Sequence, residues 1–280
     1  MRKSISKKTM KQFSRRLLKS FNSRYAYSQK GVDASYWIKK QWEKIVSPRP
    51  DITIESFDHD DWSQISVIAT IPGSENSNDV VILGAHLDST SSRDGSMTPD
   101  KPAPGADDDA SGITVITEAL RSIINTGYRP RKTIQIQAYA VEELGLIGSR
   151  DIAKTYLNEG YWNVVGMVQF DMVGYKGNEK AIMLTEDFSN VDHSRFLCDL
   201  VAKYMPRIQC RLFKCRYGCS DHAAWYEQGF PATLASEAGN NPYYHKETDT
   251  FKTIDKKYMV SFAKMAVVYL AELAKGTCEK

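Results

Sequence analysis

The chain has 280 residues, of which 42% are hydrophobic and 25% charged, an ordinary composition for a globular protein. Its formal net charge of +3 is too small to indicate a nucleic-acid partner. No run approaches the roughly 18 apolar residues that a membrane-spanning helix requires. The length is sufficient for one large α/β domain with a filled core.

The N-terminal segment MRKSISKKTMKQFSRRLLKSF is basic, but no apolar stretch follows it, so it is not an intact secretion signal. Phe13, Leu17, Leu18 and Phe21 recur at helical spacing, which predicts a first helix over about 8–21 with these side chains facing the core. A basic amphipathic arm is the alternative. We expect residues 1–16 to form a peripheral segment of a single domain that spans 1–280.

Strands and helices are then predicted to alternate along the chain. The expected strands cover 64–71, 80–85, 133–140, 164–170 and 181–184, and the expected helices cover 33–46, 111–126, 146–157, 192–205 and 256–274. Such alternation is typical of βαβ units around a largely parallel sheet. Binding sites in these sheets lie beyond the carboxyl ends of the strands.

Five metal-binding side chains lie at strand ends or in the turns that follow them. A zinc ion without thiolate ligands is held by His and carboxylate groups, and two zinc ions can share one carboxylate. The sequence therefore predicts a site for two Zn²⁺ ions per chain, held by His86, Asp108, Glu143, Asp171 and His245.

Other interpretations of these residues are simpler. A lone His after a strand is more often structural than a ligand, but Asp88 follows His86 by two residues and can accept its second N–H. Asp107 or Asp109 alone could cap a helix. A bound cation explains the whole acidic triplet better, because adjacent buried carboxylates repel one another.

Glu142 has a different predicted role from its neighbour Glu143. Adjacent side chains diverge, so Glu142 does not easily bind the same metals as Glu143. We expect Glu142 to act as the general base that takes the proton of the metal-bound water and delivers it to the leaving amine.

The contiguous Ser220-Asp221-His222 segment contains the residue types of a catalytic triad. Contiguous residues cannot align a nucleophile, a base and an orienting group, so we expect Ser220 or Asp221 to cap a helix over 223–227 instead. His59 and His193 lie in polar contexts and are expected at the surface.

Cys215 and Cys219, four residues apart, are the informative pair among five cysteines. Their spacing fits a small disulfide loop and two free thiols equally well. A zinc knuckle is not favoured, because no second Cys or His pair accompanies them.

The motifs as a set resemble the secreted bacterial leucyl aminopeptidases, which are co-catalytic di-zinc exopeptidases. The resemblance runs from about residue 17 to about residue 255, nearly the whole chain. It is carried by GAHLDST, APGADDDASG, AYAVEELGLIGS, FDMVGYKG, CRYGCSDHAAW and HKETDT. It implies a single α/β domain with a mixed, mostly parallel central sheet flanked by helices.

The resemblance also implies roles for individual residues. Asp108 would bridge the metals, with His86 and Asp171 completing one zinc site and Glu143 and His245 the other. Glu142 would be the general acid/base, Asp88 the outer-shell partner of the zinc histidine, and Tyr217 a hydrogen-bond donor to the substrate carbonyl. Cys215 and Cys219 would form a disulfide, so we expect a secreted protein whose leader is absent from this chain.

The substrate pocket is where this chain departs from the family pattern. The stretch PATLASEAGNNPYYH before the last ligand is short, with small residues where large aromatics are expected. Tyr243 or Tyr244 could add an apolar wall. The expected pocket residues are Met172, Leu184, Cys215, Cys219, Leu234, Ser236 and Glu237, the last a candidate attractor of basic side chains.

The resulting hypothesis is a monomeric di-zinc aminopeptidase that removes apolar, Leu-like residues from peptides with a free N-terminus. We expect this enzyme to have no nucleic-acid or membrane partner. The alternatives are an aminopeptidase that prefers basic residues, a single-zinc glutaminyl cyclase and a metal-free binding domain. A five-ligand set argues against the last two, because a cyclase needs one metal and a binding domain would lack ligands.

Overall fold

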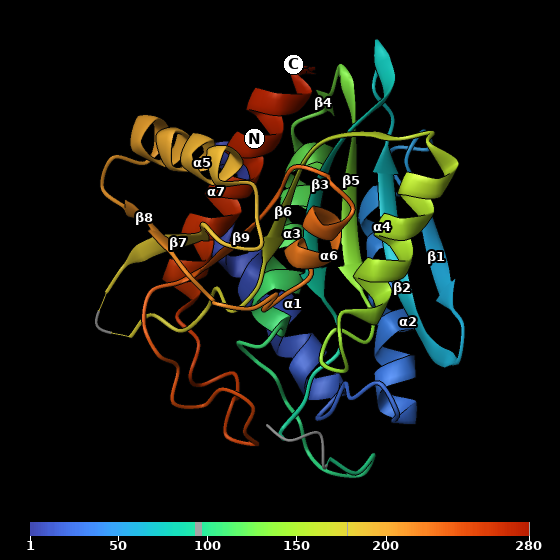
Figure 1. The fold of residues 1–280 in the computed structure, drawn as a ribbon, viewed down its shortest axis with the longest axis vertical. Coiled ribbons are helices and arrows are strands. Elements are labelled where there is room, and N and C mark those ends of the chain that lie inside the picture. Colours follow the sequence, from blue (N-terminus) through green and yellow to red (C-terminus); the bar gives the residue numbers. More distant parts are fainter. Residues whose placement is uncertain (93–96, 178, 280) are drawn as a thin grey trace.

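The fold is built on one eight-stranded mixed sheet, seen in a computed structural model that describes residues 1–92, 97–177 and 179–279 (Figure 1). The strand order is β1-β2-β5-β3-β6-β9-β7-β8. The strands are β1 (Thr53–His59), β2 (Trp62–Ile71), β3 (Asn76–His86), β5 (Lys132–Tyr139), β6 (Asn163–Phe170), β7 (Ala181–Thr185), β8 (Gln209–Phe213) and β9 (Ala232–Glu237). β4 (Tyr128–Arg129) and β10 (Thr277–Cys278) form a separate two-stranded sheet.

Helices cover both faces of the sheet. They are the 3-10 helix η1 (Arg2–Ser4) and the α-helices α1 (Lys7–Ser20), α2 (Gln29–Val46), α3 (Ala110–Asn125), α4 (Ile147–Glu159), α5 (Val191–Tyr204), α6 (His222–Glu227) and α7 (Lys256–Ala274). α4 and α6 lie in front of the sheet in Figure 1, and α1, α2, α3 and α7 lie behind it. The α/β fold predicted from the sequence is confirmed, with a sheet that is parallel at its centre.

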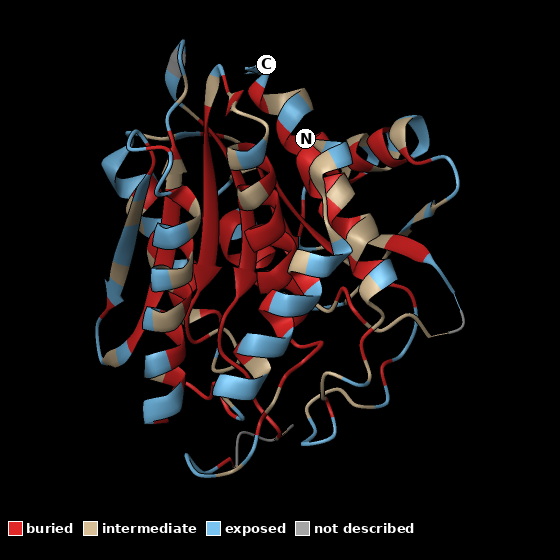
Figure 2. Ribbon diagram, turned by 180° about the vertical axis from the view of Figure 1, so that it is seen from behind, coloured by how far each residue is buried: buried red, intermediate tan, exposed pale blue. Residues whose placement is uncertain are grey.

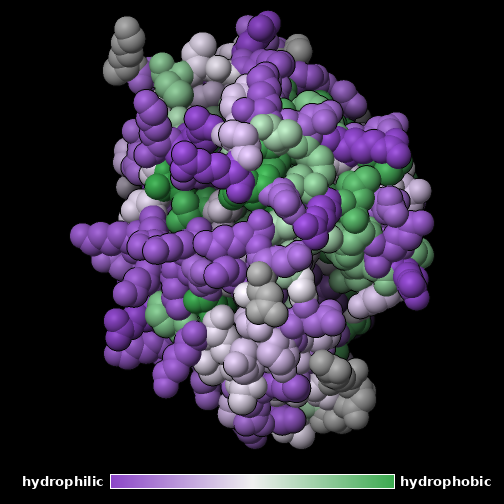
Figure 3. All heavy atoms as spheres, turned by 90° about the vertical axis from the view of Figure 1, so that its left-hand side faces the viewer, coloured by the Kyte–Doolittle hydropathy of each residue, from purple (hydrophilic) through white to green (hydrophobic). Residues whose placement is uncertain are grey.

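The centre of the sheet is buried on both faces, as its continuous apolar runs predict. Along β3, Val81 and Leu83 belong to the large core under α3 and α7, whereas Val80 and Ile82 belong to a smaller core under α4 and α6. Figure 2 shows the resulting buried strands behind partly exposed helices. The side of the molecule that carries β7 and β8 is covered mostly by hydrophilic residues, with hydrophobic areas between them (Figure 3).

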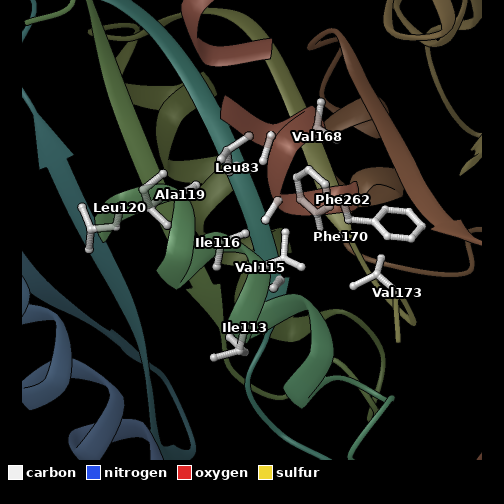
Figure 4. Packing of buried hydrophobic residues seen from close by; sticks show 14 of the residues in the cluster. Leu83, Ile113, Val115, Ile116, Ala119, Leu120, Val168, Phe170, Val173 and Phe262 are labelled. Atoms are coloured by element: carbon white, nitrogen blue, oxygen red, sulfur yellow. The ribbon is translucent and has the colours of Figure 1, made fainter. Parts of the chain in front are cut away.

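Helix α3 is the central packing element on the rear face. Its Ile113 and Ile116 lie with Leu83 of β3 and with Val168 and Phe170 of β6 (Figure 4). All five side chains are fully buried. Burial of one such side chain contributes about 1.5–3 kcal/mol, so this contact fixes α3, and the loop before it, against β3 and β6.

The N-terminal segment is not peripheral, which corrects the expectation for residues 1–16. Met10 and Phe13 are buried in the large core, as is Leu17 one turn further on. The backbone N–H of Ser6 donates to Glu118 Oε1 at 2.8 Å, which ties the start of α1 to α3. The apolar residues of α1 therefore form a buried stripe, and its basic residues lie on the exposed face, as in an amphipathic surface helix.

Three strands of the eight-stranded sheet are not predicted from the sequence. β1 and β8 are edge strands whose residues are mostly exposed or half-buried, so their patterns lack an apolar run. β9 is central, but its sequence ATLASE contains one large apolar residue. Small residues suffice there because neighbouring side chains fill both faces.

His59 and His193 are buried, so the prediction that they lie at the surface is wrong. His59 Nδ1 lies 2.7 Å from Asp151 Oδ2, and its Nε2 lies 2.8 Å from Ser66 Oγ. His193 Nε2 lies 3.0 Å from the hydroxyl of Tyr269. Each histidine buries its ring by giving its nitrogens partners that sequence context does not reveal.

Two disulfides are present, one more than the sequence indicated. Cys215–Cys219 closes the loop after β8, and Cys198–Cys210 joins α5 to β8. Cys278 is free and exposed. No helix in the described part of the chain combines the length and the apolarity that crossing a bilayer requires.

Thiol titration tests this pairing. The unfolded, unreduced protein should present one reactive thiol, that of Cys278, and the same sample after reduction should present all five. Three thiols before reduction would mean that one of the two bridges does not form in solution.

Candidate active site

Four parallel strands bring the candidate metal ligands to one edge of the sheet. β5, β3, β6 and β9 are neighbours in this order and run parallel, so their carboxyl ends meet at the lower edge in Figure 1. His86 ends β3, Glu142 and Glu143 follow β5, and Asp171 follows β6. His245 lies in the segment after β9.

Asp108 lies between the two histidines. Its Oδ1 is 3.0 Å from His86 Nε2, and its Oδ2 is 3.1 Å from His245 Nε2. His86 Nε2 is also 3.6 Å from Asp171 Oδ1, and His245 Nε2 is 3.0 Å from Glu143 Oε2. The five predicted ligands thus form two groups that share one aspartate.

Each residue of the aspartate triplet has a different set of contacts. Asp107 Oδ1 accepts the backbone N–H of Gly174 at 2.7 Å. Asp109 caps α3 by accepting the N–H of Gly112 at 2.8 Å, and its other oxygen accepts the N–H of His86 at 3.2 Å. Only Asp108 directs both oxygens at the histidines. Asp109 is therefore the helix cap that was its alternative role, whereas Asp107 holds the segment after β6 and caps no helix.

Gly112 is required by this geometry. A Cβ at that position would lie 2.1 Å from the carbonyl oxygen of Phe170 and within 2.6 Å of both carboxylate oxygens of Asp109. The close approach lets the start of α3 pack directly against the end of β6.

Asp88 connects His86 to the two glutamates. Its carboxylate accepts the backbone N–H groups of Glu142 at 3.0 Å and of Glu143 at 3.1 Å. It also lies 3.4 Å from His86 Nδ1. Val141, just before the glutamates, has a φ of 56°, which is rare for a β-branched residue and turns the chain sharply at this point.

Positive φ values recur at two other ligand segments. Met172, directly after Asp171, has a φ of 51°, and His245 itself has a φ of 52°. Neither residue is a glycine, so the surrounding structure must hold them in the left-handed region. Such backbone strain is concentrated at functional sites in proteins.

The electrostatics of the site are dominated by buried carboxyl groups. Burial raises the pKa of Glu143 to about 7, and the charge of Asp108 adds to this effect. Burial also raises the pKa of Glu142 well above its usual range, although His86 opposes the shift. For Asp108, burial is outweighed by the close approach of His245 and His86, which holds its pKa below the ordinary value.

The donor set fits a divalent cation. Both ring nitrogens of His86 and Asp171 Oδ1 are buried and have no hydrogen-bond partner within the described residues. Nitrogen and carboxylate oxygen donors are the ligands that zinc accepts, and a cation would offset the repulsion between the acids. Three clusters have donor atoms within 4.8 Å of one another: His86 with Asp109 and Asp171, His86 with Glu142 and Glu143, and Asp108 with Glu143 and His245.

A cavity of about 890 Å³ opens beside these residues. Its wall includes Cys215, Cys219, Tyr217, Met172, Leu234, Ser236 and Glu237, as the sequence predicts, together with Met183, Phe213 and Tyr244. Of the two tyrosine alternatives, Tyr244 lines the cavity and stacks on His245, whereas the ring of Tyr243 packs against Tyr175.

Leu184 does not line this cavity, in contrast to the sequence prediction. Its neighbour Met183 lines the cavity instead. Met183 pairs with Ser236 across β7 and β9, and Leu184 pairs with Ala235. Because side chains alternate along a strand, Met183 and Ser236 face the cavity while Leu184 and Ala235 face the core.

Glu237 lines the cavity, but its carboxyl group is directed into the protein. One oxygen accepts the backbone N–H of Tyr175. Burial, together with the neighbouring charge of Asp107, holds the pKa of Glu237 well above its usual range. These contacts weaken its capacity to select a basic side chain.

Tyr217 lies at the mouth of the cavity with 60% of its surface exposed. Burial of the remainder, and then the charges of Glu142, Asp171 and Asp108, raise the pKa of its hydroxyl. The hydroxyl therefore keeps its proton and can donate a hydrogen bond toward the site. Asp187 holds the loop that carries Tyr217 by accepting the N–H of Cys215 at 3.0 Å and that of Arg216 at 2.8 Å.

Asp221 does not cap α6, in contrast to the prediction. Its carboxylate makes no side-chain cap hydrogen bond and instead accepts Gln169 Nε2 at 2.7 Å. It is fully buried, and its charge contributes to the raised pKa of Glu142. Ser220 and His222, the neighbours of Asp221 in the chain, are also buried. This segment is therefore part of the protein interior.

Two supporting residues were not predicted. Asp249 accepts the backbone N–H groups of Asp107 and Asp108, which holds the loop of the shared aspartate. The guanidinium of Arg24, fully buried, donates to the carbonyls of Leu87, Pro104 and Gly105. Neither residue has a local sequence signal, because each acts on backbone far away in the chain.

Some solved structures share the fold at low sequence identity. A glutaminyl cyclase from an Acidobacteriales bacterium superposes with a TM-score of 0.79 at 15% identity, over 97% of this chain and 95% of that chain. At this identity the likeness concerns the fold alone.

Aminopeptidases are more similar in sequence. Leucine aminopeptidase 1 of Aspergillus fumigatus is 34% identical over 291 residues, which cover 98% of this chain and 73% of that protein. Leucine aminopeptidase 1 of Arthroderma gypseum is 35% identical over 277 residues, covering 92% of this chain and 72% of that protein. The LapA aminopeptidase of Legionella pneumophila superposes with a TM-score of 0.89 at 29% identity, over 99% of this chain and 74% of that chain.

The model of peptidase family M28 matches residues 66–270, a range that includes every candidate ligand and Glu142. Family match, fold and sequence relatives agree, and the chain therefore belongs to peptidase family M28, among its aminopeptidases.

Proposed function

We propose that this aminopeptidase binds two Zn²⁺ ions and removes apolar N-terminal residues from peptides. The observation that carries the proposal is the position of Asp108, whose two oxygens lie 3.0 Å and 3.1 Å from different histidines. His86, Asp171 and Asp108 would hold one ion, and Glu143, His245 and Asp108 the other. Zinc bound there would supply Lewis acidity, which lowers the pKa of water and polarises a peptide carbonyl.

Glu142 is the proposed general acid and base. Its Oε2 lies 4.0 Å from His86 Nε2, at the edge of the ligand set and within the cavity wall. It would accept the proton of the attacking water and pass it to the nitrogen of the leaving amine. Its raised pKa suits this exchange, because it makes the carboxylate a stronger base than an ordinary glutamate.

The free N-terminal amine is the feature that the site would recognise. Asp171 is the proposed anchor, because it lines the cavity beside the proposed zinc ligands. The hydroxyl of Tyr217 would donate to the carbonyl of the first peptide bond. Together these groups would hold that bond beside Glu142, and positioning supplies a large share of catalysis.

The first side chain would enter the apolar part of the cavity. Met172, Met183, Phe213 and Leu234 supply this wall. The small Ser236 and Gly239 leave space, so we propose that several apolar residues are accepted rather than leucine alone. A missing methylene changes discrimination by only about 1–3 kcal/mol.

We further propose that the protein acts as a monomer in an oxidising, extracellular environment. Its two disulfides support this location, because disulfides are rare in reducing compartments. A single-zinc cyclase remains the competing function of this fold, and the second histidine–carboxylate pair around Asp108 disfavours it.

Replacement of Glu142 by glutamine tests the general base. Glu142→Gln keeps the size of the side chain and the ligand set but cannot take a proton. We expect kcat to fall roughly 100- to 10,000-fold, with the zinc content unchanged. The exposed Glu159→Gln variant is the matched control and should behave like the wild type. Turnover of Glu142→Gln near the wild-type rate would assign the proton transfer to another group.

A substrate panel tests the amine anchor and the pocket. Chromogenic amides of Leu, Met, Phe, Lys and Arg should be compared with N-acetyl-Leu amide. Acetylation should cost far more activity than any change among the apolar side chains, because it removes the charge that Asp171 would hold. Cleavage of the acetylated substrate at a comparable rate would refute exopeptidase action.

The same panel examines Glu237. Glu237→Gln should leave the relative rates for Lys and Arg substrates unchanged, since its carboxyl group is directed into the protein. A selective loss of Lys and Arg cleavage in this variant would instead show that Glu237 governs a basic pocket.

A further inference from the structure

A second cavity of about 890 Å³ lies where the start of α1, the loop after Tyr175 and the start of α7 meet. It shares no lining residue with the cavity beside the candidate ligands. Its volume is within the range of small-molecule sites. Its lining contains six lysines, and we call it the lysine cleft: Lys7, Lys11, Lys176, Lys252, Lys256 and Lys257.

The charges of the lysine cleft are largely unneutralised. Asp255 is the one acidic residue of its described lining, and its carboxylate already accepts the backbone N–H groups of Lys257 and Tyr258. The ammonium of Lys256 donates to the carbonyls of Phe251 and Ile254. The other five lysines have no ion pair with any described residue.

Positive charges of the lysine cleft lie close enough to repel one another. Burial lowers the pKa of Lys256, and the charge of Lys11 lowers it further, while Asp255 opposes the shift. The lysines come from three segments that are far apart in the sequence, so helical spacing alone does not explain why they converge. A concave surface of one charge concentrates counter-ions more strongly than a flat one.

The lining of the lysine cleft also contains aromatic side chains. Tyr175 and Phe251 also line the cleft, and Lys256 Nζ lies 4.1 Å from the centroid of the Phe251 ring. Its bonds to two carbonyls and this ring hold Lys256 in place, which makes it the least mobile cation of the cleft. Lys252 is exposed and Lys176 is half-buried, and neither has a hydrogen bond within the described residues that would keep it from turning toward a ligand.

We propose that the lysine cleft binds a ligand with several closely spaced oxyanions. Sulfate or phosphate esters and the carboxylates of an acidic peptide share this chemistry. Charge-assisted hydrogen bonds from ammonium groups to oxyanions would hold the ligand, outside the proposed zinc centre. The proposal does not depend on the hydrolytic function, because binding is measured without turnover.

Isothermal titration calorimetry of the full chain tests the proposal. The two probes are sucrose octasulfate and N-acetyl-tetraglutamate, titrated at low ionic strength; the acetyl group blocks the peptide from the proposed amine anchor. Binding of at least one probe supports the cleft, and the probe that binds more tightly identifies the source of the oxyanions. Binding should weaken as sodium chloride is added, because salt screens exposed charges.

Variants locate the binding. Lys176→Ala/Lys252→Ala should raise the dissociation constant by about tenfold, which corresponds to roughly 1.4 kcal/mol. Lys176→Arg/Lys252→Arg keeps the charge and should retain binding. Lys19→Ala/Lys154→Ala removes the same charge from exposed sites outside the cleft and should change the constant less than about twofold. Absence of binding by both probes, or an equal loss in the control, would overturn the proposal.

Discussion

The excess of buried carboxyl groups at the carboxyl ends of β3, β5 and β6 is the constraint on which the rest of the structure depends. Each acid requires compensation, since an unpaired buried charge costs several kcal/mol. Asp88, Asp107 and Asp109 obtain it from backbone N–H groups. Asp108 and Glu143 instead face histidines, and this division separates the acids that shape the loops from those available to a cation.

Buried charged side chains also hold the loops that carry the candidate ligands, through hydrogen bonds with the loop backbone. Asp249 holds the backbone of the Asp108 loop, and Arg24 donates to carbonyls of the two segments that flank the ligands. α3 continues the Asp108 loop into the large core, where its apolar side chains pack on β3 and β6. The shared aspartate is therefore held by hydrogen bonds on one side and by packing on the other. Rigid placement of this kind is what a metal centre requires.

The sequence allowed the buried centre of the fold to be predicted, because β3 and β6 are apolar runs and the acids that follow them are conspicuous. It did not reveal β1, β8 or β9, whose residues are exposed or small. Leu184 was misassigned by one residue, since the face that a strand residue occupies depends on the pairing of β7 with β9. Cys198–Cys210 and the contacts of Arg24 depend on tertiary proximity, so no local pattern indicates them.

The sharing of Asp108 by two zinc ions is the central proposal for this site. Anomalous diffraction at the zinc absorption edge from crystals of the zinc-loaded protein measures this directly. We expect two peaks about 3.5–4 Å apart, one on each side of the Asp108 carboxylate, with His86 and His245 on different peaks. A single peak, or two peaks that do not both contact Asp108, would contradict the proposal.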